Sequence, residues 1–123
     1  GLITLNAFTA STDIIIPLVS EVLPFKGLTM ITDFINMVKR KLNPLVKVSG
    51  ILITRWEGSK LSKGIEEKLR EALGEQVFDT KIRKNIRLAE APLENRNIVD
   101  YDKSSNGAKD YIQFTEEFLA RIQ

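Results

Sequence analysis

Two apolar runs with an amphipathic segment between them most restrict how this chain can fold. The run from Asp13 to Val19 (DIIIPLV) is apolar on both alternating faces, and the run from Val46 to Thr54 (VKVSGILIT) is rich in β-branched residues. Strands that are apolar on both faces are typical of parallel sheets, which helices cover on both sides. Residues 25–42 keep apolar side chains three and four positions apart, which predicts the crossover helix between them. The sequence therefore predicts an α/β fold built on a parallel sheet.

The rest of the chain continues the same alternation of helices and strands. The further predicted elements are helices at 1–10 and 62–73, strands at 76–82 and, at an edge, 97–101, and a last helix after a turn at 104–107. Ser62 is the expected N-cap of its helix, and Gly74 is expected to end that helix. Pro17 is expected to end the first strand or to mark a bulge, with residues 19–24 at the strand's carboxyl edge.

Only three strong strands are present, and the first of them calls for neighbours on both sides because both of its faces are apolar. We therefore expect residues 1–123 to form a single partial domain. Such a domain either belongs to a larger sheet or completes one by pairing with a second copy.

Composition excludes several kinds of site. The 123 residues include no Cys and no His, which argues against disulfides, thiolate metal sites, Ser-His-Asp catalysis and zinc hydrolysis. The net charge is only +2, so any affinity for nucleic acid must come from local clusters of basic side chains. The apolar runs are far shorter than the ~20 residues that cross a bilayer. With no leader pattern in the sequence, the cytoplasm is the expected compartment.

The stretch from Thr80 to Pro92 (TKIRKNIRLAEAP) has the most unusual composition. We expect it to be a loop after the third strand, with basic side chains at Lys81, Arg83, Lys84 and Arg87. Parallel α/β sheets bind ligands in the loops that leave the carboxyl ends of their strands. On composition alone, a solvated charged turn is the favoured interpretation of this stretch.

Several motifs occur in one order with fixed gaps and change that weighting. They are GLITLNAF, DIIIPL, KGL, KIRKNIRLAEAP and YDKSSNGAKDY. In this order they resemble the carboxyl-terminal half of ParA/Soj-type partition ATPases, relatives of MinD in the deviant-Walker P-loop group. The resemblance runs nearly from end to end and is densest at R-x-A-E-A-P. It implies the carboxyl-terminal half of a P-loop NTPase with a Rossmann-like, three-layer fold.

The nucleotide loop K-G-G-x-G-K-T and the D-x-P-P switch of such proteins are not in this sequence. Phosphoryl transfer needs backbone amides and a lysine around the phosphates, and Mg²⁺ ligands beside them. We therefore predict that this chain alone neither hydrolyses ATP nor retains ATP and Mg²⁺. The resemblance implies that an intact relative binds both, dimerises around the nucleotides, and binds DNA without sequence preference. It also implies a centromere-binding ParB-like partner, a cytoplasmic, nucleoid-associated location and no membrane binding.

The resemblance also implies which residues this half contributes. The expected purine-side wall consists of Thr54, Arg55, Ile82, Arg83, Lys84, Asn85, Glu90, Ala91 and Pro92. The family commonly has I-P-R-N, whereas this chain has Ile-Arg-Lys-Asn at 82–85, and the missing proline weakens the purine assignment. The expected DNA contacts are first Arg87, then Lys84 and Arg83, then Lys39, Arg40 and Lys41.

Alternatives stay open for these residues. Arg87 could equally form a salt bridge with Glu90 inside the domain, since the two lie three residues apart. Residues 39–41 are more simply a cationic helix end that complements the helix dipole.

Two other functions are compatible with the sequence. A stand-alone half-domain could act as an interaction module that assembles through an exposed sheet edge. A MinD-like membrane ATPase is disfavoured, because Asp110, Glu116 and Glu117 dilute the basic character of the terminal helix.

Overall fold

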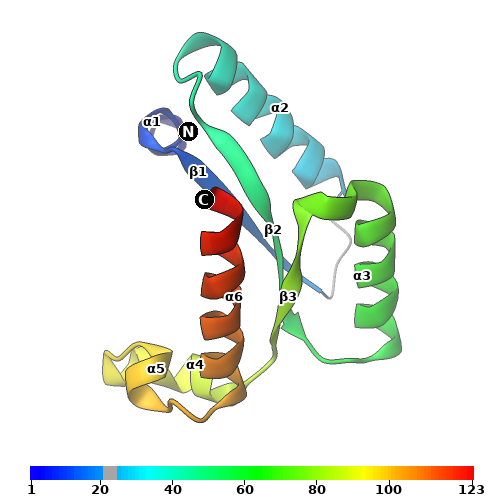
Figure 1. The fold of residues 1–123 in the computed structure, drawn as a ribbon, viewed down its shortest axis with the longest axis vertical. Coiled ribbons are helices and arrows are strands. Elements are labelled where there is room, and N and C mark those ends of the chain that lie inside the picture. Colours follow the sequence, from blue (N-terminus) through cyan, green and yellow to red (C-terminus); the bar gives the residue numbers. More distant parts are fainter. Residues whose placement is uncertain (21–24) are drawn as a thin grey trace.

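A three-stranded parallel sheet in the order β1-β2-β3 forms the centre of the molecule (Figure 1). We analysed a computed structural model, which describes residues 1–20 and 25–123. The strands are β1 (Asp13–Val19), β2 (Lys47–Trp56) and β3 (Val77–Arg83). Both strand pairs are parallel, so the predicted parallel α/β sheet is confirmed.

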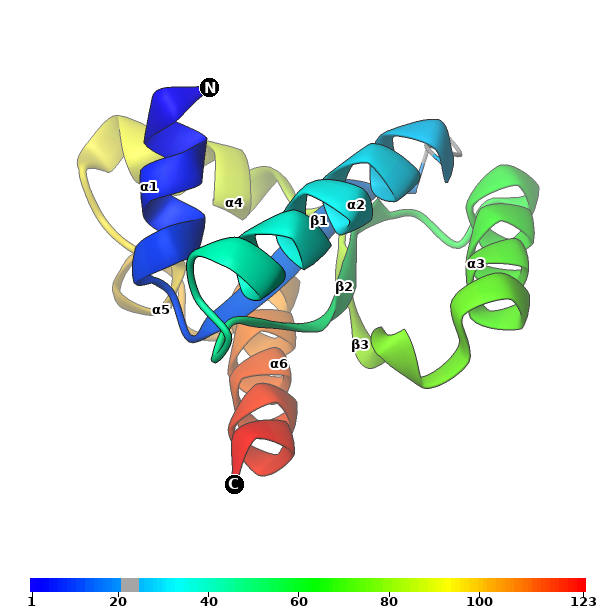
Figure 2. The ribbon, with the colours of Figure 1, turned by 90° about the horizontal axis from the view of Figure 1, so that it is seen from above.

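Helices cover both sides of this sheet and make three layers. The helical elements are α1 (Leu2–Ala10), α2 (Phe25–Lys41), α3 (Lys60–Leu73), η1 (Gly74–Gln76), α4 (Ile86–Glu90), η2 (Ala91–Glu94), α5 (Ile98–Tyr101) and α6 (Asn106–Ile122). Helices α2 and α3 connect consecutive strands and lie on one side of the sheet, whereas α6 lies on the other side (Figure 2). The predicted crossover helices are therefore confirmed.

The core consists of two apolar clusters separated by the sheet. The larger cluster joins the strands to α2 and α3 and includes the fully buried side chains of Val38, Ile53 and Leu69. The smaller cluster joins the sheet to α6, where the rings of Phe78 and Phe114 meet edge to face with centroids 4.8 Å apart. Full burial of such side chains stabilises a fold by roughly 1.5–3 kcal/mol each. The apolar periodicity of the sequence thus identifies the faces that form the core.

Helix α3 begins earlier than predicted. Ser59, not Ser62, is its N-cap: the Ser59 hydroxyl accepts a hydrogen bond from the Ser62 backbone N–H at 3.1 Å. The prediction of Ser62 as the cap was wrong because two serines lie three residues apart and both can cap a helix. Gly74 ends α3 as predicted, with a φ of 54° that favours glycine.

Two further sequence predictions were wrong. Residues 97–101 were expected to form an edge strand, but they hold the short helix α5, because the Asn97 side chain accepts the backbone N–H of Asp100 at 2.9 Å. The stretch 80–92 was expected to be a loop. It continues β3 to Arg83 and then forms α4, whose start Asn85 caps in the same way.

Strand β1 does not end at its proline. It continues through Pro17 to Val19, and its register shift lies earlier, between Ile14 and Ile15. Of the residues expected at its carboxyl edge, 21–24 lie outside the described residues. Proline is tolerated in an edge strand because its missing N–H removes no ladder bond there.

Carboxylates of α6 bind the edge of β3 that faces away from β2. The Glu117 carboxylate accepts the backbone N–H groups of Asp79 at 2.7 Å and Thr80 at 2.8 Å. Asp110 accepts the backbone N–H of Arg83 at 2.9 Å. These bonds satisfy donors that would otherwise offer a template for another strand. In the described part of the chain, no strand lies beside the outer edge of β1.

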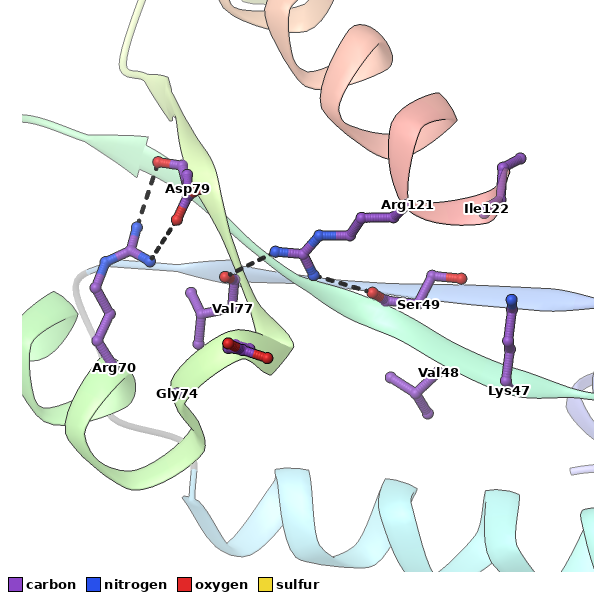
Figure 3. A pocket seen from close by; sticks show the side chains of 10 residues that line it. Lys47, Val48, Ser49, Arg70, Gly74, Val77, Asp79, Arg121 and Ile122 are labelled. Carbon is purple, nitrogen blue, oxygen red and sulfur yellow. Dashed lines mark hydrogen bonds and ion pairs between the residues drawn. The ribbon is translucent and has the colours of Figure 1, made fainter.

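A cavity of about 790 Å³ lies where the amino-terminal ends of β2 and β3 separate (Figure 3). The Arg121 guanidinium bridges this gap and donates to the carbonyl oxygens of Ser49 and Val77, each at 3.2 Å. It also lies 4.2 Å from the centre of the Phe78 ring. Arg121 thus supplies hydrogen bonds at a place where the two strands do not bond to each other.

The close contact of β2 with Phe78 gives a stability prediction. A Cβ atom at Gly50 would lie 2.6 Å from the Phe78 ring and 2.9 Å from the Arg121 guanidinium. We expect Gly50→Ala to lower the free energy of unfolding by about 1–3 kcal/mol, measured by urea denaturation. Gly64→Ala is the control, since Gly64 lies within α3 and a Cβ there meets nothing within 4 Å. The control should be stabilising by roughly 0.5–1 kcal/mol, and a destabilisation equal to that of Gly50→Ala would contradict the packing explanation.

The Glu117 contact gives a prediction about pH. Burial tends to raise the pKa of Glu117, but the Thr80 and Asp79 N–H groups and Arg121 outweigh it and lower the pKa below 4.5. A lowered pKa stabilises the fold above the unfolded value, and this contribution disappears as the pH falls through the folded value. Glu117→Gln should therefore weaken the loss of stability that acid causes below about pH 4.5.

Urea denaturation at a series of pH values tests this. The matched control is Glu116→Gln, an exposed neighbour on the same helix. An unchanged acid dependence in Glu117→Gln would show that its contact with β3 adds no stability.

Candidate functional site

A cavity of about 610 Å³ lies at the carboxyl ends of the three strands. Its lining comes from the ends of β1, β2 and β3, from α4 and from α6. The lining residues are Pro17, Thr54, Arg55, Ile82, Arg83, Lys84, Asn85, Ile86, Leu88, Ala89 and Tyr111. We call this space the carboxyl-edge cavity. It combines an apolar lining with a few polar groups, which is the composition typical of small-molecule sites.

The structure brings together six of the nine residues predicted for the purine-side wall. These six are Thr54, Arg55, Ile82, Arg83, Lys84 and Asn85. The other three do not line the carboxyl-edge cavity. Glu90 ends α4, Ala91 is buried, and Pro92 lies within η2, so these three shape the chain's return after the cavity.

Sequence reasoning missed several lining residues. Pro17 could have been found, because it lies near the carboxyl end of a predicted strand, where parallel sheets bind ligands. Tyr111 could not have been found in this way. It belongs to α6, and its position in the lining depends on how that helix packs against the sheet.

The backbone at the rim of the cavity is unusual. Arg55 has a φ of 53°, in the left-handed region that residues with a side chain seldom adopt. The Ser20 hydroxyl donates to the Arg55 carbonyl at 3.1 Å, and the Thr54 hydroxyl donates to the Leu18 carbonyl at 3.1 Å. Strained backbone of this kind concentrates at ligand sites.

Arg83 is held by α6. Its Nε lies 3.0 Å from one oxygen of Asp110, and an Nη lies 2.9 Å from the other. The Asp110 side chain is only 7% exposed, whereas that of Arg83 is 43% exposed. The hydrogen bond from Asp110 raises the pKa of Arg83, so the guanidinium stays charged. A bidentate pair of this kind fixes direction as well as distance.

Lys81 is tied to the inside of the sheet. Its Nζ lies 3.1 Å from Glu66 and 4.2 Å from the centre of the Trp56 ring. Trp56 itself lies at the end of β2 and packs against the larger core cluster, which confirms its predicted role as a lid on the core.

Lys84 and Arg87 are also paired with acids, but on the surface. Lys84 lies 2.8 Å from Glu57, and Arg87 lies 3.0 Å from Glu90 and 3.3 Å from Asp102. The salt bridge between Arg87 and Glu90, the alternative to a DNA contact, is therefore present. The two cations keep 53% and 49% of their side chains exposed. Exposed ion pairs contribute little to stability, so another anion can compete for these cations.

Lys39, Arg40 and Lys41 are not brought together with the other basic residues. They form the last turn of α2, at the opposite end of the molecule from α4 (Figure 1). The described residues give none of them an ion pair, and the Arg40 Nε donates to the Asn36 carbonyl. Their position is that of cations at a helix carboxyl end.

Two other kinds of site were searched for in residues 1–20 and 25–123. No group of three or more acidic, His or Cys side chains is placed to hold a metal ion. None of the helices in that part of the chain has the length and apolar character needed to cross a membrane.

Known proteins resemble this chain over most of its length. Residues 5–98 match the family described as the CobQ/CobB/MinD/ParA nucleotide binding domain (CbiA). The chromosome partitioning protein ParA of Myxococcus xanthus is 35% identical over 98% of this chain and 43% of that protein. The chromosome-partitioning ATPase Soj of Thermus thermophilus is 36% identical over 98% of this chain and 49% of that protein. The chain thus spans about half the length of these relatives.

Solved structures share the fold. The cobyrinic acid a,c-diamide synthase of Mycobacterium smegmatis superposes with a TM-score of 0.77 at 24% identity, over 100% of this chain and 44% of that one. The same enzyme with bound ADP and magnesium gives a TM-score of 0.73 at 25% identity, over 94% of this chain and 41% of that one. The chain is a member of the CobQ/CobB/MinD/ParA family of nucleotide-binding domains.

Proposed function

We propose that this chain is the carboxyl-terminal part of a ParA/Soj-type partition ATPase. The intact protein would bind ATP with Mg²⁺, form a homodimer and bind DNA without sequence preference, and so segregate a plasmid, chromosome or mobile element. The observation that carries the proposal is the 35–36% identity to ParA and Soj proteins over 98% of the chain. A ParB-like protein on the segregated DNA would be its partner, and the nucleoid its location.

The carboxyl-edge cavity supports a division of labour within such an ATPase. Its apolar lining and polar rim suit a purine base, while the sequence has no glycine-rich loop to hold phosphates. The phosphate-binding part must therefore come from outside these 123 residues.

A simple assay tests this division. We expect the purified 123-residue chain to release no phosphate from Mg-ATP above the background of a sample without protein. An intact Soj protein serves as the positive control. Turnover by this chain at a comparable rate would contradict the proposal, because no residue here replaces the phosphate-binding loop.

The basic stretch supports the DNA-binding part of the proposal. Lys84 and Arg87 are half exposed, and their acidic partners lie on the surface. A DNA phosphate can displace such partners, and a guanidinium can bind it through two hydrogen bonds. Residues so placed contact the DNA backbone and not the bases, which fits binding without sequence preference.

A charge reversal tests the DNA contact. We expect Lys84→Glu with Arg87→Glu to weaken binding of the 123-residue chain to a fluorescent DNA duplex about tenfold or more at low salt, measured by fluorescence anisotropy. The salt dependence should fall by about two phosphate contacts. Lys60→Glu with Lys63→Glu on α3 is the control, because it changes the net charge equally on exposed residues. Equal losses in both double variants would show that only net charge matters and that the basic stretch is not the contact surface.

A second candidate function rests on the two edges of the sheet. Side chains of α6 bind the outer edge of β3, whereas β1 has no strand at its outer edge within the described residues. An unpaired edge is a template for association, so a stand-alone half-domain could act as an interaction module. Light scattering at high concentration separates the possibilities, because a stable monomer argues against assembly through β1.

A further inference from the structure

Asp110 is a buried carboxylate with a role that the sequence did not reveal. It lies in the second turn of α6 and accepts four hydrogen bonds, all from Arg83. One comes from the backbone N–H at 2.9 Å, and the others come from the guanidinium. A buried charge is retained only when its partners satisfy it, and here one residue supplies all of the bonds that we observe.

Arg83 lies at a boundary between two hollows. It lines the carboxyl-edge cavity, and it also lines a smaller cavity of about 340 Å³ together with Trp56, Glu57, Lys84 and Asn106. Its side chain therefore separates the two. The direction of that side chain, which Asp110 fixes, determines where the carboxyl-edge cavity ends.

The residue after Asp110 connects α6 to the same cavity. Tyr111 belongs to its lining, opposite the rim formed by Arg83, Lys84 and Asn85. The bond from Asp110 to the Arg83 backbone therefore sets the position of the rim relative to the tyrosine. A flat aromatic base needs such a pair of walls at a fixed separation, and rigid support of the walls improves binding.

We propose that Asp110 is the positioning residue of a purine-binding cavity, a role that rests on the proposed function. It holds Arg83 at the rim and keeps the rim in register with Tyr111. Arg83 then belongs to the base-binding wall, and its guanidinium is not available to DNA. Lys84 and Arg87 remain as the DNA contacts of the basic stretch.

Glu117 provides a matched control for a purely structural role. It is seven residues further along α6, and it also accepts backbone N–H groups of β3. Its partners Asp79 and Thr80 do not line the carboxyl-edge cavity. Loss of either carboxylate should lower stability, whereas only loss of Asp110 should change binding in the cavity.

The test is a titration of the ¹⁵N-labelled 123-residue chain with adenosine, followed by NMR. Adenosine is the probe because it has no phosphates, and the chain has no loop to hold them. We expect the amide signals of Thr54, Lys84 and Tyr111 to shift in the unmodified chain. Asp110→Asn should weaken adenosine binding about five- to tenfold, and Glu117→Gln should leave it within about twofold.

Different failures have different meanings. Equal weakening in Asp110→Asn and Glu117→Gln, or no weakening in either, would overturn the positioning role while leaving the purine site in place. An unmodified chain whose cavity signals do not respond to adenosine would overturn the purine site and the positioning role together. The DNA experiment above would still stand on its own.

A second variant covers the case in which Asp110→Asn does not fold. Arg83→Lys keeps the positive charge beside Asp110 but cannot form the bidentate pair. We expect it to weaken adenosine binding to a similar extent and to retain a folded spectrum. Unchanged affinity in a folded Arg83→Lys protein would overturn the proposal.

Discussion

The attachment of α6 to the edge of β3 is the interaction on which the site depends. Glu117 binds the middle of the strand and Asp110 binds its last residue, so one helix aligns the strand at two points. At the other end, Arg121 bridges β3 to β2. A strand held in this way cannot shift its register without breaking charge-assisted hydrogen bonds. The carboxyl-edge cavity inherits this order, because its rim begins where β3 ends.

The same attachment makes the two edges of the sheet unequal. On the β3 side, α6 occupies backbone donors that a further strand would need. On the β1 side, the described residues leave the edge without a strand, and the exposed Val19 lies at its end. A sheet of this kind can grow only from β1. That direction is consistent with relatives about twice as long as this chain, and it also explains why self-association through β1 is the competing possibility.

The sequence predicts the regular part of the fold well and the local contacts poorly. The strands and the long helices follow from apolar periodicity, which survives in any context where a face is buried. The edge strand expected at 97–101 failed because a five-residue segment carries no useful period, and a single asparagine cap decided for a helix. Six cavity residues followed from the family resemblance. Tyr111 did not, because its place depends on the packing of α6.

The pairing of the basic stretch shows why composition alone misjudges such a segment. The partner of Arg87 three residues away is visible in the sequence, but Arg83 finds its acid 27 residues further on. The acids also differ in burial, from 7% exposed for Asp110 to 41% for Glu57.

Burial of the acid decides what a phosphate can displace, since a buried partner cannot be resolvated when its cation leaves. Arg83 is therefore bound within the fold, whereas Lys84 and Arg87 exchange partners at little cost. One continuous basic segment thus divides into a residue that supports the cavity and two residues that face outward for an anionic partner.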